Sequence, residues 1–136
     1  MWNLPEPGDI VWGNFPEDSR EDPGPKPRPC LVISVSKTGN DYQITVASGT
    51  SKKLDKLYTG DVSITERLNK EAYQYAGLKL DTKFQLSVMK KLPWNDHFFG
   101  VRADKRFGDS PKIGKLHESM MRAFAAAYNA VKNSRV

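Results

Sequence analysis

The 136-residue sequence contains little of what several common protein chemistries require. Cys30 is the single cysteine, so an internal disulfide is excluded, and two histidines provide no spaced ligand set for zinc. No apolar run approaches the ~20 residues that a membrane-spanning helix needs. The first nine residues carry neither Lys nor Arg nor a continuous apolar stretch, unlike a secretory signal. We therefore expect a soluble, cytoplasmic protein that uses no metal or other cofactor and does not bind a membrane.

Charge is distributed unevenly along the chain, whose formal net charge is +5 and whose isoelectric point is near 9.3. Residues 1–68 hold 8 Lys and Arg against 10 Asp and Glu, a net charge of −2, whereas residues 69–136 hold 13 against 6, a net charge of +7. Basic residues gathered in one part of a chain favour a phosphate-rich partner, although they also fit an ordinary solvated surface. Charge alone does not decide between the two.

Short β-type segments separated by glycine and proline turns dominate the sequence. We predict six strands, at residues 9–15, 30–36, 42–47, 61–64, 82–92 and 98–101. The nearly continuous apolar run in the second of them is typical of a strand buried on both faces. This pattern predicts a mostly β protein, a single SH3-like small barrel domain covering residues 1–136.

Helices are predicted only as an insert and at the end of the chain. Asn69 is a candidate N-cap for a short helix through Tyr75, which Gly77 would end. The closing element is predicted to be an amphipathic helix with an apolar stripe against the barrel or a partner. The stripe consists of Leu116, Met120, Phe124, Ala127, Tyr128 and Val131.

A long loop precedes the residue that we place at the centre of a candidate site. Residues 16–27 contain four prolines and one glycine, a composition that cannot continue a sheet, and a loop of this length is often functional. Arg28 follows between Pro27 and Pro29, which restrict its backbone, and its planar guanidinium suits bidentate contact with phosphate. A surface ion pair with the acidic loop is the alternative role for Arg28.

Polar residues at other strand ends complete the candidate site. Thr50 and Ser51 follow the third predicted strand, and Lys83 opens the fifth. We expect these side chains to converge on Arg28. Further basic residues next to Thr50 are candidates for contact with a nucleic-acid backbone, or form a solvated face. They are Lys52, Lys53 and Lys56.

In order and spacing, these segments resemble the MazF/PemK family of toxin endoribonucleases, the toxic halves of type II toxin–antitoxin pairs. The run from Gly8 to Phe15 is similar to the opening strand of the family, and Arg28-Pro29 leads into a similar "LVIS" strand. Thr50-Ser51 stands at the family's "TS" pair, and residues 83–85 resemble its later segment of a basic residue, a spacer and an aspartate. The resemblance covers roughly residues 7–92, and the closing helix more loosely.

The resemblance implies an SH3-like barrel and a homodimer that binds single-stranded RNA across its surface. It also implies metal-independent cleavage through the ribose 2′-hydroxyl and inhibition by a cognate antitoxin protein. Arg28 would stabilise the phosphorane, Thr50 and Ser51 would hydrogen-bond the phosphate or ribose, and Lys83 would stand where the family often has an arginine. Hydrogen-bond donors of this kind can stabilise the developing charge without a metal ion.

Gln85 departs from the family pattern. It stands where some relatives carry an aspartate as candidate general base, and an amide cannot accept a proton at neutral pH. The base is therefore missing or is supplied elsewhere, by Asp81, Asp9 or His117. Two alternatives to a nuclease follow: a catalytically weakened relative that binds only RNA or an antitoxin, and a gyrase-poisoning toxin with the same barrel.

Aromatic residues are candidates for stacking unpaired bases. The four in question are Trp12, Phe15, Tyr58 and Trp94. Positions inside a strand favour a core role for Trp12 and Phe15, whereas Trp94, at a strand end, fits either role.

Overall fold

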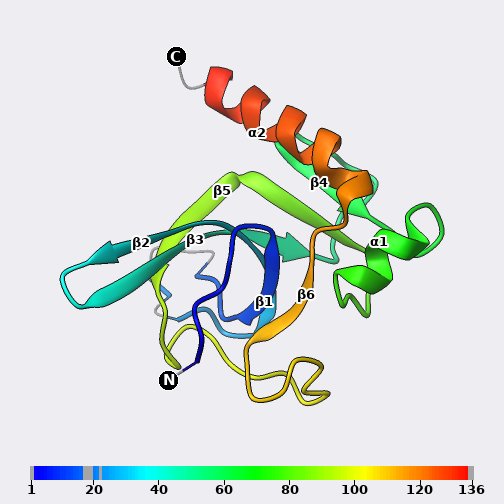
Figure 1. The fold of residues 1–136 in the computed structure, drawn as a ribbon. Coiled ribbons are helices and arrows are strands. Elements are labelled where there is room, and N and C mark those ends of the chain that lie inside the picture. Colours follow the sequence, from blue (N-terminus) through cyan, green and yellow to red (C-terminus); the bar gives the residue numbers. More distant parts are fainter. Residues whose placement is uncertain (1, 17–19, 22, 135–136) are drawn as a thin grey trace.

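The structure, a computed structural model, describes residues 2–16, 20–21 and 23–134. Within them lies one curled antiparallel sheet with the strand order β4-β5-β3-β2-β1-β6 (Figure 1). Its strands are β1 (Asp9–Gly13), β2 (Arg28–Thr38), β3 (Asp41–Thr50), β4 (Asp61–Ile64), β5 (Thr82–Pro93) and β6 (Lys112–Lys115). The helices are α1 (Lys70–Tyr75), the 3₁₀ turn η1 (Glu118–Met120) and α2 (Met121–Ser134). The prediction of a mostly β small barrel with a closing helix is confirmed.

Strand β5 connects two parts of the sheet. It pairs with β3 along most of its length, from Gln43↔Pro93 to Thr50↔Lys83, and its first residues pair with β4 as well. The register shifts between Ala47 and Ser48, and a bulge of this kind bends a strand. Figure 1 shows β5 sharply bent at its middle. The two halves of β5 can therefore pair with parts of the sheet that run in different directions.

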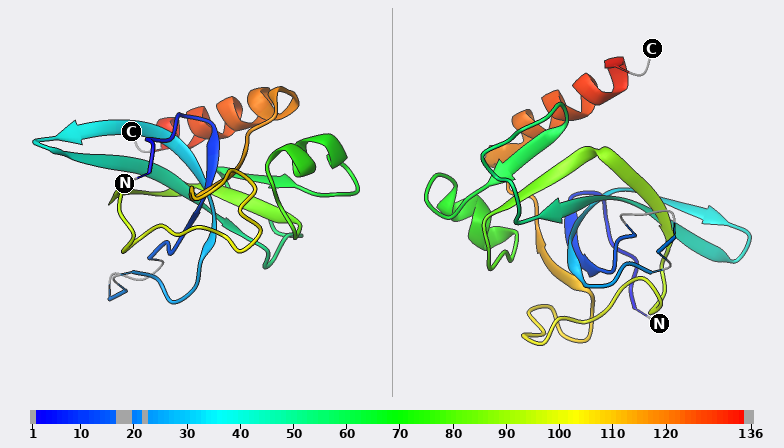
Figure 2. Two further views of the ribbon diagram at one scale, coloured as in Figure 1. Left: turned by 60° about the horizontal axis from the view of Figure 1, so that its bottom comes forward. Right: turned by 180° about the vertical axis from the view of Figure 1, so that it is seen from behind.

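Apolar residues alternate between the two faces of the sheet and form two clusters. Leu31 and Ala47 belong to a larger cluster that α1 and α2 help to cover, whereas Cys30 and Val46 belong to a smaller one on the other face. Burial on both faces is confirmed for residues 30–32. It is wrong for residues 33–36, which are only partly buried or exposed, because the β2–β3 hairpin projects beyond the barrel (Figure 2).

The short helix α1 forms where it was predicted, but its start differs in detail. Asn69 occupies the N-cap position without capping the helix by its side chain; its Oδ1 instead accepts a hydrogen bond from the Thr65 amide at 3.1 Å. Gly77, with φ +72°, follows the helix as expected.

Helix α2 begins at Met121, later than the stripe suggested. The Leu116 amide donates to the Gly8 carbonyl at 2.7 Å, which keeps this part of the chain extended. Phe124 and Val131 are buried against the sheet, while Tyr128 remains 37% exposed, so it lies outside the packed stripe. None of the described helices has the length and apolarity needed to cross a membrane.

Two edge predictions need correction. The segment 98–101 is not a strand: among the described residues it makes a single bridge, Gly13↔Phe99. Strand β6 was missed because Lys112-Ile113-Gly114-Lys115 has one β-branched residue and reads as a turn, yet it pairs with β1. Sheet pairing at an edge outweighs local propensity here.

Candidate active site

The predicted site residues share one row across the sheet. Thr50 on β3 lies directly opposite Lys83 on β5, which in turn lies opposite Ser63 on β4. On the other side of β3, Cys30 pairs with Ser48, and β2 and β3 each extend two residues beyond this pair, to Arg28 and Thr50. Residues directly opposite in an antiparallel sheet project from the same face. The structure thus places this row of Arg28, Thr50 and Lys83 at the neighbouring ends of β2, β3 and β5.

The backbone at Arg28 is held from several sides. Arg28 pairs with Gly13 at the end of β1, and the buried Cys30 thiol donates to the Arg28 carbonyl at an Sγ–O distance of 3.6 Å. Burial raises the pKa of the Cys30 thiol from 9.0 to about 12, although the positive charge of Arg28 and a hydrogen bond to the Gly13 backbone lower it. The thiol is therefore neutral and serves as packing.

A hollow of about 280 Å³ lies at the Arg28 end of the row. Four cationic residues line it, and none of its described lining residues is acidic. Ser51 lines it as well, whereas Thr50 does not. The cations are Lys26, Arg28, Lys79 and Arg102. Asp104 pairs with two of them, at 3.6 Å from Lys79 Nζ and 2.8 Å from Arg102 Nη2, which reduces the positive charge of the hollow. The remaining excess of positive charge still attracts an anion.

Arg102 is the cation in this hollow whose hydrogen bonds are most fully described. It forms a bidentate pair with Asp104, with Nε–Oδ1 and Nη2–Oδ2 distances of 2.9 and 2.8 Å, and donates from Nη1 to the Gly77 carbonyl at 2.8 Å. Its guanidinium also lies 5.5 Å from the centroid of the Trp12 ring. Hydrogen bonding to Arg102 lowers the pKa of Asp104 to about 2. Arg102 therefore forms part of the wall of the hollow, and its guanidinium already donates hydrogen bonds to Asp104 and Gly77.

Glycine at position 49, which lines the hollow, allows the neighbouring strands to pack closely. A Cβ there would come within 2.8 Å of both the Pro29 carbonyl oxygen and Thr82 Cγ2. β2 and β5 therefore approach β3 closely at this point, between the two hydroxyl residues Ser48 and Thr50. The hydroxyl of Thr50 accepts a hydrogen bond from the Lys52 amide at 3.2 Å, which fixes its place at the strand end.

Lys83 does not reach the surface. Its ammonium lies 3.3 Å from Asp61 Oδ2, donates to the Lys56 carbonyl at 2.6 Å, and is covered by the Tyr58 ring, whose centroid is 5.5 Å away. The side chains of Lys83 and Asp61 are 3% and 1% exposed. Position alone made Lys83 a candidate phosphate contact, but in this structure its charge is satisfied within the protein.

Gln85 has a carboxylate as its direct neighbour. It lies opposite Asp61 on β4 and opposite Ser48 on β3, in the row next to that of Thr50. Sequence reasoning missed Asp61, because only the order of strands in the sheet reveals that β4 stands beside β5. The Ser48 hydroxyl in this second row is buried and has no hydrogen-bond partner among the described residues.

The three alternative bases lie elsewhere. Asp81 Oδ1 accepts from the Glu66 amide at 2.8 Å, and Asp9 is buried beside β6. His117 caps η1: its Nδ1 accepts from the Ser119 amide at 3.1 Å. None of the three lines the hollow that contains Arg28.

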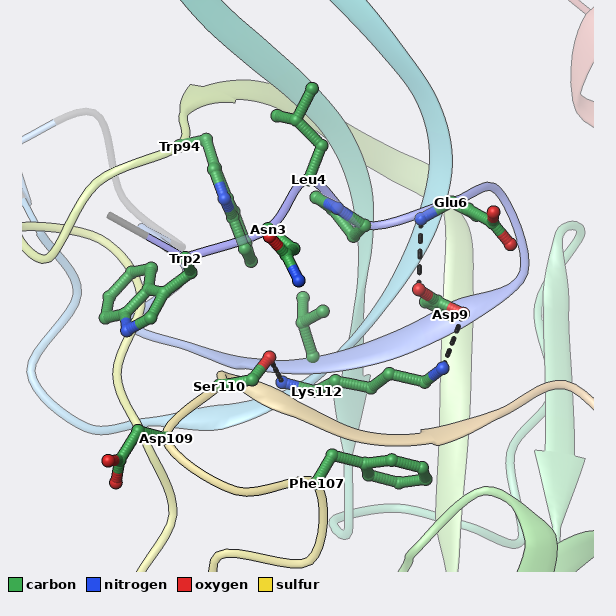
Figure 3. Close-up of a pocket in the computed structure, with 12 residues that line it drawn as sticks. Trp2, Asn3, Leu4, Glu6, Asp9, Trp94, Phe107, Asp109, Ser110 and Lys112 are labelled. Carbon is green, nitrogen blue, oxygen red and sulfur yellow. Dashed lines mark hydrogen bonds and ion pairs between the residues drawn. The ribbon is translucent and has the colours of Figure 1, made fainter.

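A second, larger hollow of about 600 Å³ lies between the N-terminal segment and β6 (Figure 3). Carboxylates from Glu6, Asp9 and Asp109 line it against a single lysine, Lys112. Its excess of negative charge disfavours a phosphate. Trp94 also lines it and is 8% exposed, so this tryptophan packs instead of presenting a face to solvent.

The candidate aromatic and basic contacts fall into distinct groups. Phe15 is buried in the smaller core cluster, as favoured, whereas Trp12 is partly buried and lines the Arg28 hollow. Tyr58 is 64% exposed. The three loop lysines, Lys52, Lys53 and Lys56, are exposed. Within the described part of the chain, no three His, Cys, Asp or Glu side chains gather closely enough to hold a metal ion.

Comparison with known protein families matches residues 6–129 to the family described as PemK-like, MazF-like toxin of type II toxin–antitoxin system. The match covers most of the chain, including every residue of the row and the hollow. No curated protein matches the chain.

Proposed function

We propose that this chain, which belongs to the PemK-like, MazF-like toxins of type II toxin–antitoxin systems, is an endoribonuclease that cuts single-stranded RNA without a metal ion. The observation that carries the proposal is the row of Arg28 and Thr50 next to a hollow lined by four cations. A site with this charge favours the phosphate backbone. Membership of the family also means that the partner is an antitoxin protein.

The chemistry uses the 2′-hydroxyl of the RNA itself. The 2′-oxygen attacks the neighbouring phosphorus, the bond from phosphorus to the 5′-oxygen breaks, and the products end in a 2′,3′-cyclic phosphate and a 5′-hydroxyl. Arg28 donates two hydrogen bonds to the phosphate as its charge grows, and the hydroxyls of Thr50 and Ser51 donate to its oxygens or to the ribose. Charge stabilisation of this kind is often the largest catalytic contribution.

Proton transfer is the weaker part of this site. Gln85 cannot take a proton, and the Asp61 carboxylate is enclosed by its contacts with Lys83 and the Tyr58 amide. We therefore assign the removal of the 2′-proton, and the protonation of the leaving oxygen, to solvent. The cleavage rate should then rise about tenfold per pH unit through neutrality, because hydroxide is the base. A plateau in the profile would instead indicate a side-chain base.

RNA binding extends along the loop after β3. Lys52, Lys53 and Lys56 are exposed there and would contact the RNA backbone. We also propose that the protein acts in the cytoplasm as a homodimer, to which Leu68 and Leu80, 72% and 65% exposed, offer apolar surface. Light scattering of the purified protein measures the oligomeric state directly.

The test is cleavage of long single-stranded RNA in EDTA by the purified protein. Wild type should cut, and Arg28→Ala should cut roughly 100- to 1000-fold more slowly, as when one oxyanion contact is removed. Thr50→Ala should lose a smaller factor. Arg122→Ala, an exposed arginine on α2, is the control and should retain the wild-type rate. End analysis should find 2′,3′-cyclic phosphates.

Three results would overturn the proposal or the active site that it assigns. Intact RNA after incubation with wild type, while the protein still binds it, would identify a catalytically weakened binding protein. Intact RNA combined with inhibition in a DNA supercoiling assay would identify a gyrase poison. Equal cleavage by wild type and Arg28→Ala would leave an RNA-cutting protein with a different active site.

A further inference from the structure

The loop between β3 and β4, residues 51–60, is tied down by a buried ion pair. Lys83 donates to the carbonyl of Lys56, and Asp61 Oδ2 accepts from the amide of Tyr58 at 3.0 Å. Both charged groups therefore complete their hydrogen bonding with the backbone of this loop. A buried ion pair is retained only when such additional bonds satisfy it, because removing two charges from water is costly. The pair holds the loop in one shape over β5.

Tyr58 is the residue that this arrangement displays. This residue is 64% exposed, more than any other exposed aromatic residue in the described part of the chain. One face of the ring lies over the Lys83 ammonium at 5.5 Å, and its own amide is bonded to Asp61. The ring is thus both anchored and accessible. An aromatic ring fixed in this way can bind a planar group at little further cost in conformational entropy.

The position of Tyr58 relates it to the proposed cleavage site. Lys83 lies opposite Thr50, and Arg28 is one further strand away. Two strand spacings amount to about 10 Å. Exposed lysines precede Tyr58 on the same loop, at positions 52, 53 and 56. Cations that follow a backbone, with an aromatic ring among them, are the composition of surfaces that bind single-stranded nucleic acid.

We propose that the Tyr58 ring is a stacking subsite for an unpaired nucleobase of the bound RNA, near the phosphate held by Arg28. Lys83 and Asp61 are the positioning residues of this subsite: they hold the loop and do not touch RNA. This inference rests on the proposed function for the identity of the ligand and adds to it a determinant of binding. It also gives the Lys83 charge a role that phosphate contact does not.

The test uses a short single-stranded oligonucleotide in which every 2′-hydroxyl is replaced by 2′-O-methyl, so that it binds without being cut. Tyr58→Ala should bind it about 5- to 100-fold more weakly than wild type, since stacking on one aromatic ring contributes that much. Tyr58→Phe should bind within about twofold of wild type, because it keeps the ring. Tyr75→Ala, at a tyrosine 48% exposed on α1, should leave binding unchanged.

A second measurement separates stacking from a general effect on the loop. One base at a time is removed from the oligonucleotide to leave an abasic position. At one position, removal should weaken wild-type binding but leave Tyr58→Ala binding unaffected, because the variant has already lost the ring on which that base stacks. Asp61→Asn should behave like Tyr58→Ala in this series. It should bind the complete oligonucleotide more weakly than wild type does, and should bind the oligonucleotide with that abasic position about as well as wild type does.

The outcomes distinguish this inference from the proposed nuclease. If wild type cuts RNA but Tyr58→Ala binds as well as wild type, or no abasic position removes the difference, the stacking subsite is overturned alone. If Tyr58 dependence is found and natural RNA stays intact, the subsite stands and the nuclease is overturned. If wild type does not bind the oligonucleotide at all, the subsite is overturned, and the nuclease is overturned with it if natural RNA also stays intact.

Discussion

Gln85 on β5 lies directly opposite Asp61 on β4, with the Lys83 ammonium 3.3 Å from the Asp61 carboxylate. A carboxylate is absent from position 85 but present one strand away, at Asp61. There it pairs with Lys83 and is shielded from solvent. The chain therefore keeps an acidic group in the second row, that of Ser48 and Gln85, without exposing a base to the substrate. Substitutions of Gln85 and of the Lys83–Asp61 pair should therefore have different effects.

Gln85→Asp should add a general base to the proposed site. The new carboxylate would stand beside the Asp61 carboxylate, and this like charge raises its pKa. We expect cleavage at neutral pH to rise by about tenfold or more, and the pH–rate profile to bend to a plateau above the new pKa. Steady-state kinetics across the pH range measure both effects, with Gln85→Asn as the control. An unchanged profile would show that position 85 does not face the reacting groups.

Breaking the buried pair should cost more than removing it. Lys83→Met or Asp61→Asn alone leaves an uncompensated group inside the protein, and we expect each to lower the free energy of unfolding by about 3–5 kcal/mol. The double variant Lys83→Met with Asp61→Asn should lose clearly less than the sum of the two single variants. Urea denaturation of the four proteins gives the coupling. Additive losses would mean that the two side chains act independently.

Gly77→Ala should be severely destabilising. Gly77 has φ +72°, and a Cβ on it would lie 1.8 Å from the Ile113 carbonyl oxygen, so backbone must move. We expect a loss of roughly 3 kcal/mol or more in the free energy of unfolding. Gly39→Ala is the matched control: φ is +64° and nothing lies within 4 Å of the added atom, so only about 1–2 kcal/mol is at stake. Equal losses at both positions would contradict the close approach at Gly77.

The Cys30 thiol should resist alkylation in the folded protein. Burial raises its pKa to about 12 from 9.0, so at pH 8 it is neither exposed nor ionised. A chromogenic disulfide reagent should react with it only after denaturant is added. The contribution of the neutral thiol to stability is fully present below pH 9 and is lost as the pH rises toward 12. Rapid labelling of the native protein would contradict its place in the core.

Asp104 should remain ionised in unusually acidic solution. Hydrogen bonding to Arg102 lowers its pKa from 3.8 to about 2, so the stabilisation it provides is present above pH 3.8 and is lost as the pH falls through about 2. NMR titration of the carboxyl carbon measures the midpoint. In Arg102→Ala the midpoint should return toward 3.8. A normal midpoint in the wild type would mean that the pair with Arg102 does not persist in solution.

Local pattern predicted much of the sheet. The bounds of β4 at Asp61–Ile64 agree with the prediction, and β1, β2, β3 and β5 formed around their predicted apolar cores. Each of these has β-branched residues in alternation or in a run, and that signal is carried by adjacent residues. β6 has only Ile113 of this type, so its existence depends on pairing with β1, which no local pattern encodes.

The candidate site was predictable only in part, for the same physical reason. Arg28 and Thr50 stand at strand ends that sequence alone identifies. The pairing of Lys83 with Asp61 requires that β5 enters the sheet next to β4, and Arg102 reaches the hollow because Phe99 bridges to Gly13. These contacts join segments distant in sequence, and only the assembled sheet determines them.

The place of β5 between β3 and β4 also constrains how the protein is made. β4 has no other described strand partner than β5, and Lys83, which fastens the 51–60 loop, lies on β5 itself. A nascent chain that ends before Thr82 already carries Arg28 and Thr50, but it lacks Lys83, so its 51–60 loop is not yet held in place. On the ribosome, the site therefore assembles only after β5 has emerged, and the acidic and basic halves of the chain cannot be produced as separate working pieces.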